Sequence, residues 1–199
     1  MDDALVRQLE RSRALGFLGP GAVEDHVDHA MGFVEALAAV MGTVVDLGSG
    51  GGVPGLVLAC VRPDLTVVLV DAMEKRCAFL EEATGALGLA NVQVVHGRAE
   101  IVGRSQLRGA ADAVVARGFG SPAVTAECAA PLLRVGGQLV VSEPPGGAPR
   151  WPADPLVDLG LVVGHRSTSG PLVQVLVQTA PCPEQYPRRN GMPAKRPLF

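Results

Sequence analysis

The 199 residues suit one domain with a single core, because two cores of about 100 residues each would be small. Hydrophobic residues make up 48% of the chain and aromatic residues only 4%, so the core must be built mainly from Val, Leu and Ala. The formal net charge of −3 excludes a global basic field of the kind that drives nonspecific binding to nucleic acid. Any such contact must therefore come from a local cluster of cations.

The pattern of apolar residues predicts two helices at the start of the chain, over 1–15 and 22–41. From residue 42 onwards, short β-branched runs alternate with helical patterns. Strands are predicted at 44–47, 65–70, 92–95, 111–115, 138–141, 161–166 and 172–178, and helices at 55–61, 74–87 and 122–133. We therefore expect one domain over 1–199, with N-terminal helices in 1–41, a core over 42–180 and a basic, Pro-rich tail over 181–199.

The alternation of strands and helices favours an α/β fold with a parallel sheet, right-handed crossovers and helices on both faces. Only residues 167–171 separate the last two predicted strands, so these should pair as an antiparallel hairpin. The Pro- and Gly-rich segment 143–155 predicts a loop, with at most a short turn at 154–159. A Rossmann-like, seven-stranded, mostly parallel sheet that ends in such a hairpin resembles the class I methyltransferases that use S-adenosylmethionine (SAM).

The strongest local signal is a glycine-rich segment between the first strand and the helix that follows it. It reads Asp46-Leu47-Gly48-Ser49-Gly50-Gly51-Gly52-Val53-Pro54-Gly55. Glycines let the backbone turn tightly and let a ligand approach it, and Pro is favoured at the first helical position. The segment predicts a binding loop. Gly50, Gly52 and Gly55 also satisfy G-x-G-x-x-G, so the loop alone equally fits the pyrophosphate of a dinucleotide.

Three further features favour SAM over a dinucleotide. Asp46 precedes the first glycine, where a carboxylate can order the loop and attract the cationic amine of the methionine part. Asp71 ends the next strand, in a position to accept hydrogen bonds from both ribose hydroxyls. The loop at 96–100 offers a backbone amide and the acidic Glu100 to an adenine edge. Each residue also has an ordinary interpretation as a cap or turn residue, and Asp71 would serve NAD equally well, so an NAD-binding oxidoreductase or a non-catalytic module remains an alternative.

The glycine loop, with its Val-Pro-Gly ending, is similar to that of the GidB/RsmG family of bacterial small-subunit ribosomal RNA methyltransferases. The similarity runs from about Leu18 to Leu198. It includes Arg62-Pro63-Asp64, Val70-Asp71, Lys75-Arg76, Phe79-Leu80, Gly97-Arg98-Ala99-Glu100, Ala116-Arg117-Gly118-Phe119 and Tyr186-Pro187-Arg188-Arg189-Asn190-Gly191-Met192-Pro193-Ala194-Lys195-Arg196-Pro197-Leu198.

The resemblance implies SAM contacts at Gly48, Val53, Ala99, Glu100 and Arg117, and a 7-methylguanosine product in the RNA of the small ribosomal subunit. The guanine nitrogen concerned carries a free lone pair, so the reaction needs no general base and requires only alignment with the methyl donor. Arg117, at the end of the fourth strand, is the candidate positioning residue, since ligands bind at that edge of open α/β sheets. It could orient SAM or hold an RNA phosphate. Without the resemblance, a surface ion pair would be its ordinary interpretation.

Three features depart from the family pattern. The N-terminal helical region is short, and the helix usually found between the fifth and sixth strands is reduced to a loop. Ser142-Glu143-Pro144-Pro145 stands where the family usually has Lys-Gly, so an anion replaces a cation beside the presumed target pocket and would repel a phosphate. These departures keep open a SAM-dependent methyltransferase that acts on a small molecule or a protein.

Two further segments have alternative interpretations. The tail from 184 to 199 carries four cations against one acid, and it either holds nucleic acid or is a solvated surface, which is the commoner case for a charge run. Those cations are Arg188, Arg189, Lys195 and Arg196. Trp151, in the Pro-rich loop, either stacks on a base or packs against the body, which is again the commoner case.

The remaining signals concern the cellular compartment and metals. The cysteines Cys60, Cys77, Cys128 and Cys182 form no C-x-x-C pair, and the N-terminus lacks the pattern of a signal peptide, so a reducing cytoplasm is expected. No apolar run reaches the ~18 residues that a membrane span requires. His26 and His29 lie three residues apart without a nearby cysteine; we interpret them as surface residues and expect no metal site.

Overall fold

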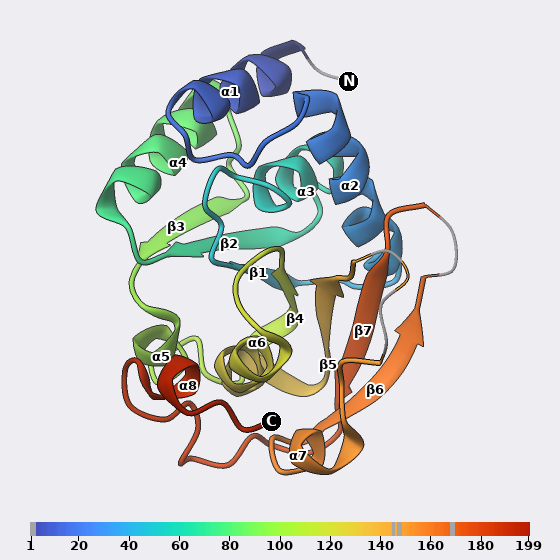
Figure 1. Cartoon of the computed structure of the whole chain (residues 1–199). Coiled ribbons are helices and arrows are strands. Elements are labelled where there is room, and N and C mark those ends of the chain that lie inside the picture. The colour runs from blue at the N-terminus through green and yellow to red at the C-terminus, as the bar shows by residue number, and fades with distance from the viewer. Residues whose placement is uncertain (1–2, 145, 147–148, 168–169) are drawn as a thin grey trace.

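The computed structural model describes residues 3–144, 146, 149–167 and 170–199. Its strands form one seven-stranded sheet in the order β3-β2-β1-β4-β5-β7-β6 (Figure 1). The bounds are β1 Thr43–Leu47, β2 Thr66–Asp71, β3 Val92–His96, β4 Ala111–Ala116, β5 Leu133–Ser142, β6 Leu161–Arg166 and β7 Val173–Gln178. The first five strands pair in parallel, and β7 pairs antiparallel with both β5 and β6. The predicted mostly parallel sheet with a C-terminal hairpin is confirmed.

Helices cover both faces of this sheet, as predicted (Figure 1). One face carries α1 Asp3–Ala14, α2 Val23–Ala36, α3 Gly55–Val61 and α4 Glu74–Ala86. The other face carries α5 Ala99–Val102, α6 Pro122–Ala129, α7 Ala153–Val157 and α8 Met192–Lys195, together with the 3-10 helix η1 at Ala130–Leu132. The tail after β7 therefore lies against the second face, where Tyr186 is buried with the side chains of that layer.

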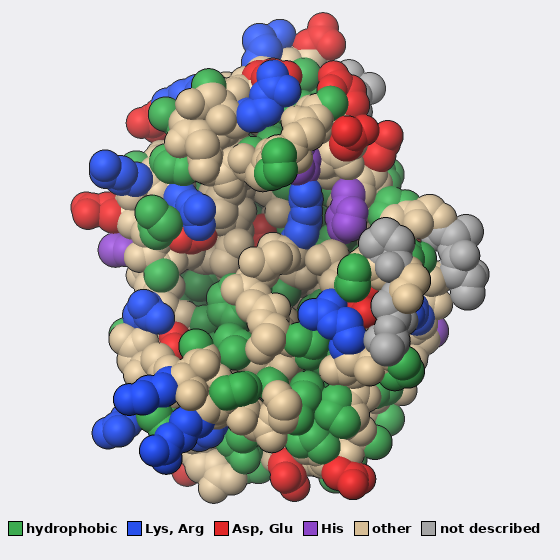
Figure 2. Space-filling view, in the orientation of Figure 1, with side chains coloured by type: hydrophobic (Ala, Val, Ile, Leu, Met, Phe, Trp, Pro, Cys, Tyr) green, Lys and Arg blue, Asp and Glu red, His purple; other side chains and the backbone are tan. Residues whose placement is uncertain are grey.

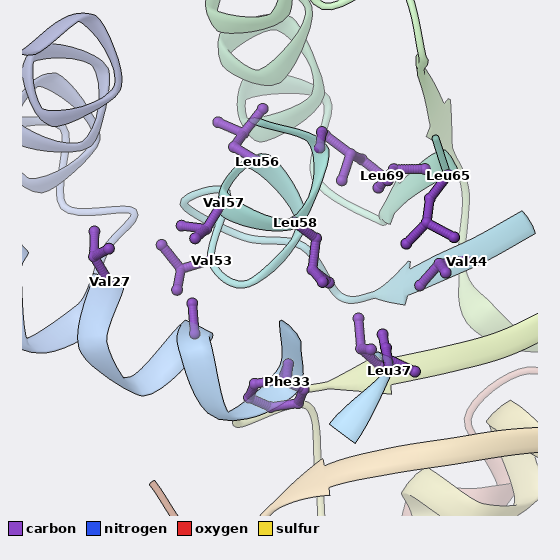
Figure 3. Packing of buried hydrophobic residues seen from close by; sticks show 14 of the residues in the cluster. Val27, Phe33, Leu37, Val44, Val53, Leu56, Val57, Leu58, Leu65 and Leu69 are labelled. Atoms are coloured by element: carbon purple, nitrogen blue, oxygen red, sulfur yellow. The ribbon is translucent and has the colours of Figure 1, made fainter. Parts of the chain in front are cut away.

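Alternating strand residues divide the core into two layers. Val44 of β1 belongs to the layer under α2 and α3, whereas its neighbour Val45 belongs to the layer under α6. This period of two is what a sheet buried on both faces requires. Figure 3 shows the first layer, in which Phe33 of α2 and Leu56 of α3 come from the helices that cover the strands.

Helices α2 and α6 and strand β5 differ from their predicted bounds by four residues or more. Helix α6 ends at Ala129 and not at residue 133, because η1 follows it and β5 begins at Leu133. Helix α2 ends at Ala36 and not at residue 41, because the chain turns at 37–39 and reaches Gly42 with a φ of +95°. Strand β5 begins at Leu133, five residues earlier than predicted, and a register shift against β4 accommodates the early start. The short helices α5 and α8 were not predicted. Among the described residues, no helix has the length and apolar character needed to cross a bilayer.

Candidate functional site

The glycine-rich loop folds over the carboxyl end of β2. The backbone N–H groups of Gly48 and Ser49 both donate to the carbonyl of Val70, at 2.8 and 2.9 Å. Gly48 has a φ of +76°, and a Cβ there would lie 2.6 Å from the Phe119 ring. A Cβ on Gly51 would lie 2.8 Å from the carbonyl oxygen of Phe17. Glycine is therefore required at these positions by close packing and, at Gly48, by the left-handed backbone as well.

Two buried carboxylates accept hydrogen bonds from the backbone of this loop and of the residues next to it. Asp46, 1% exposed, accepts a hydrogen bond from the N–H of Gly55 at 2.9 Å and so fixes the start of α3. Its burial raises the pKa of the carboxyl to about 7. Asp71, 4% exposed, accepts from the N–H of Gly50 at 2.9 Å and from the N–H of Met73 at 2.8 Å. Each carboxylate thus orders backbone that surrounds the loop.

Arg117 connects the end of β4 to α2. Its Nη2 donates to Nδ1 of His26, and Nε2 of His26 lies 3.1 Å from the carbonyl oxygen of Gly19. Because a carbonyl only accepts, Nε2 carries the hydrogen in this contact and Nδ1 accepts from Arg117. The second terminal nitrogen of Arg117, Nη1, is buried and has no hydrogen-bond partner among the described residues. A buried guanidinium nitrogen without a partner indicates a place for an acceptor group of a ligand.

These residues surround one cleft of about 300 Å³ at the carboxyl edge of the sheet. Phe17, Leu18 and Gly19 border it from the segment between α1 and α2, and Arg76 borders it from α4. Arg76 also lies over the Phe17 ring and 3.7 Å from the Asp71 carboxylate. The full lining is Phe17, Leu18, Gly19, Gly48, Ser49, Gly50, Gly51, Val53, Arg76, Arg117 and Gly118. The cleft therefore joins the N-terminal segment to the glycine loop and the end of β4.

The structure brings most of the predicted site residues together here. Gly48, Gly50, Val53 and Arg117 line the cleft, and Asp71 lies directly behind Gly50. Ala99 and Glu100 are buried at the start of α5 and are not part of this lining. The Glu100 carboxylate accepts from the N–H of Gly191 in the tail at 2.9 Å, and Arg98 lies 3.7 Å from it. Glu100 thus connects the loop after β3 to the tail.

Two parts of the site were not foreseen from the sequence. The interpretation of His26 as a surface residue is wrong, because its side chain is buried, 5% exposed, and bonded to Arg117. The signal was present, since His26 shares a helical face with Val23, Val27 and Ala30, all of which are buried. The second is Ser12 of α1, whose hydroxyl donates to the carbonyl of Gly51 at 2.9 Å. No motif indicates this long-range contact.

Burial raises the pKa of the Cys77, Cys128 and Cys182 thiols. The pKa of Cys128 rises to about 12, so its thiol stays protonated. No group of His, Cys, Asp and Glu side chains in the described ranges is arranged to hold a metal ion.

The strand order, the glycine loop after β1 and the acidic end of β2 define a class I methyltransferase. Solved methyltransferases share the fold: one is a variant of the 16S rRNA (adenine(1408)-N(1))-methyltransferase from Catenulisporales acidiphilia with SAM, with a TM-score of 0.55, 19% identity and coverage of 77% of this chain and 93% of that one. A variant of MtNAS in complex with SAM aligns with a TM-score of 0.63 and 12% identity, over 88% of this chain and 74% of that one.

The family model described as rRNA small subunit methyltransferase G (GidB) matches residues 21–143, and the chain belongs to this family. Curated relatives named ribosomal RNA small subunit methyltransferase G support this membership. The Moorella thermoacetica protein is 38% identical over 78% of this chain and 69% of its own length. The Rubrobacter xylanophilus protein is 35% identical over 98% of this chain and 80% of its own length. The predicted family, and methyl transfer as the activity of the chain, are thereby confirmed.

Proposed function

We propose that this chain transfers the methyl group of SAM to a guanine ring nitrogen of small-subunit ribosomal RNA, giving 7-methylguanosine. The observation that carries the proposal is the cleft, which the half-buried Arg117 and the glycine loop line together in a chain of this family. The relatives from Moorella and Rubrobacter are named for activity on small-subunit ribosomal RNA, which supports that substrate.

The residues of the cleft fit SAM as the group it takes. The loop from Gly48 to Gly51 lines the cleft, and Arg117 Nη1 offers a hydrogen-bond donor that has no partner in the described chain. Asp71 lies at the end of β2, behind Gly50, where its carboxylate serves a ribose. When bound, SAM supplies a methyl group on an electrophilic sulfonium. The protein's part is to hold donor and acceptor in line, because the acceptor nitrogen has no proton to lose.

The tail provides cations for RNA, although not all of those counted in the sequence. Arg188 is held by two hydrogen bonds from its guanidinium to the buried carboxylate of Glu127, at 2.6 and 2.8 Å, so it is an internal residue. Arg189, Lys195 and Arg196 are exposed. Figure 2 shows Lys and Arg side chains gathered on the part of the surface where α5 and α8 lie. Such a local patch supplies phosphate contacts on a chain that is acidic overall.

The choice of cofactor is tested by calorimetric titration. SAM and its demethylated product should bind the purified chain, and NAD should not. The variant Arg117→Ala should fold normally yet transfer methyl groups more slowly, since it removes a buried donor of a cleft-lining residue that has no partner among the described residues. Preferential binding of NAD would overturn the methyltransferase proposal.

The substrate is tested in cells. Deleting the gene and digesting the small-subunit ribosomal RNA to nucleosides should reveal the loss of one 7-methylguanosine, measured by mass spectrometry. Complementation with the natural gene should restore it, and complementation with the Arg117→Ala gene should restore less. An unchanged 7-methylguanosine content in the deletion strain would reject RNA as the substrate.

A further inference from the structure

A second cavity lies beside the cofactor cleft, at the carboxyl ends of β4 and β5. Gly118 lines both spaces. Phe119 also lines the second cavity, and its ring packs against Gly48 of the glycine loop. The full lining is Ala116, Gly118, Phe119, Gly120, Pro122, Thr125, Val141, Ser142, Arg150 and Trp151. The Phe119 ring therefore contacts both this cavity and Gly48 of the cofactor loop.

One buried carboxylate organises the outer wall of this cavity. Glu143 is 7% exposed and accepts a hydrogen bond from Nε1 of Trp151 at 2.9 Å. Nη1 of Arg150 lies 3.7 Å from the same oxygen. The carboxylate of Glu143 is thus buried, with a cation beside it, and does not lie open to a phosphate. Trp151 and Arg150 themselves line the cavity, whereas Glu143 is not part of its lining.

This combination suits a nucleotide. Aromatic side chains stack on unpaired bases, and arginine binds the phosphates that accompany them. The cavity measures about 30 Å³, which is room for a water molecule or two and not for a base. Arg150 can move to enlarge it, because its side chain is 36% exposed and its distance from Glu143 exceeds that of a hydrogen bond. Trp151, by contrast, is fixed by its bond to Glu143.

We propose that this cavity receives the base of the purine nucleotide that is methylated, with Trp151 stacking on the base, Arg150 pairing with its phosphate and Glu143 holding the indole in place. The inference rests on the proposed function and names where the target nucleotide is recognised. The position next to Phe119 and Gly48 brings such a base to the edge of the cofactor cleft.

Trp151 is the only tryptophan of the chain, so its fluorescence reports on this cavity alone. Guanosine 5′-monophosphate, titrated with excitation at the red edge of the indole band, should quench the emission to saturation. Uridine 5′-monophosphate should quench less, since pyrimidines stack more weakly. Arg150→Ala should weaken binding of the monophosphate about tenfold and leave binding of guanosine, which lacks the phosphate, nearly unchanged. Arg134→Ala, which removes a cation at the other end of β5, is the matched control and should change neither.

Methylation assays provide a second test of the role of Trp151. Trp151→Ala should raise KM for ribosomal RNA about tenfold and leave KM for SAM unchanged. Trp151→Phe should recover part of that loss, because it keeps an aromatic face without the bond to Glu143. A merely structural tryptophan would change both KM values or neither.

Two results would overturn the proposal: emission that guanosine 5′-monophosphate does not quench, or an unaltered KM for ribosomal RNA in both Trp151→Ala and Arg150→Ala. Saturable quenching that depends on Arg150, in a chain that does not methylate ribosomal RNA, would uphold the nucleotide site and reject the proposed function. The two failures are therefore distinguishable.

Discussion

Asp71 accepts hydrogen bonds from the backbone around the glycine loop and, in our account, from a ribose. Replacing it by Ala removes the acceptor for the N–H groups of Gly50 and Met73 together with the ribose contact. We expect Asp71→Ala to weaken SAM binding by about 1–3 kcal/mol, the range for stranded hydrogen-bonding groups, in a calorimetric titration. Asp71→Asn, which keeps one acceptor oxygen, should weaken it less. Unaltered affinity in Asp71→Ala would refute the ribose role.

His26 is predicted to position Arg117 through its Nδ1 and the 17–19 segment through its Nε2. His26→Ala should therefore raise the Kd for SAM about fivefold, the effect of removing one hydrogen bond of about 1 kcal/mol. His26→Asn places an acceptor near Nδ1 and should restore more affinity than His26→Gln. His165→Ala, on an exposed strand, is the control. Equal affinities in all four variants would remove His26 from the site.

Asp46 makes stability depend on pH. Its folded pKa of about 7 lies above the ordinary value of 3.8, so between these values the folded chain holds a proton that the unfolded chain has released. The free energy of unfolding should therefore fall as pH rises from 4 to 7, by up to about 1.4 kcal/mol per pH unit from this group, and level off above 7. Asp46→Asn should flatten this part of the curve. Denaturant titrations across that range that show the same slope in both proteins would contradict the assignment.

At the scale of elements, the tail is held by side chains rather than by strand pairing. Arg104 donates to the carbonyl of Pro187 at 3.0 Å, and Arg108 donates to those of Tyr186 and Cys182 at 2.8 and 2.9 Å. Arg188 completes the attachment through Glu127, which is fully buried.

Arg188→Ala would leave that carboxylate buried without its partner. We expect the free energy of unfolding, measured with denaturant, to fall by about 3 kcal/mol, because breaking a buried ion pair strands the remaining charge. The neighbouring, exposed Arg189→Ala should cost less than about 0.5 kcal/mol. Adding Glu127→Gln to Arg188→Ala should recover part of the stability. Equal stability of the two single variants would show that the tail is held in another way.

Strong local patterns predicted most elements. Helix α3 and strand β6 have the bounds that the sequence indicates; for α3, an apolar run between Pro54-Gly55 and Pro63 fixes both ends. The early start of β5 was not predicted because Gly136 and Gly137 are typical of a turn, whereas here Gly137 lies against the carbonyl oxygen of Ala111, where a Cβ would come within 3.0 Å. Helices α5 and α8 have four residues each, too few to produce a periodicity.

The sequence predicted the parts of the candidate site that lie at the ends of strands β1 and β2. Gly48, Asp46 and Asp71 belong to these parts. The contacts of His26 and Ser12 join segments far apart in the sequence, and tertiary packing alone decides them. The sequence shows the charge of Glu143, but no periodicity predicts the hydrogen bond that it accepts from Trp151, eight residues away.

At the scale of the whole molecule, two surfaces carry cations: helix α1 and the tail near α8. They differ in how many of those cations are paired with acids. The cations of α1 are partly neutralised, since Arg11 pairs with Glu82 and Arg13 with Glu10, whereas the tail presents exposed cations near α8. Replacing Arg189, Lys195 and Arg196 by Ala should lower the slope of log affinity for ribosomal RNA against log salt by about 0.7–0.9 for each phosphate that the tail no longer neutralises. The matched triple substitution of Arg7, Arg11 and Arg13 should change it less. Equal slopes would place the RNA elsewhere.

The most direct measurement is methylation with purified components. The chain is incubated with small-subunit ribosomal RNA and SAM that carries an isotope-labelled methyl group, and the RNA is then digested to nucleosides for mass spectrometry. Our account predicts label in 7-methylguanosine, with less label from Arg117→Ala than from the natural chain. Label in another nucleoside, or none in RNA under conditions where SAM binds, would contradict it.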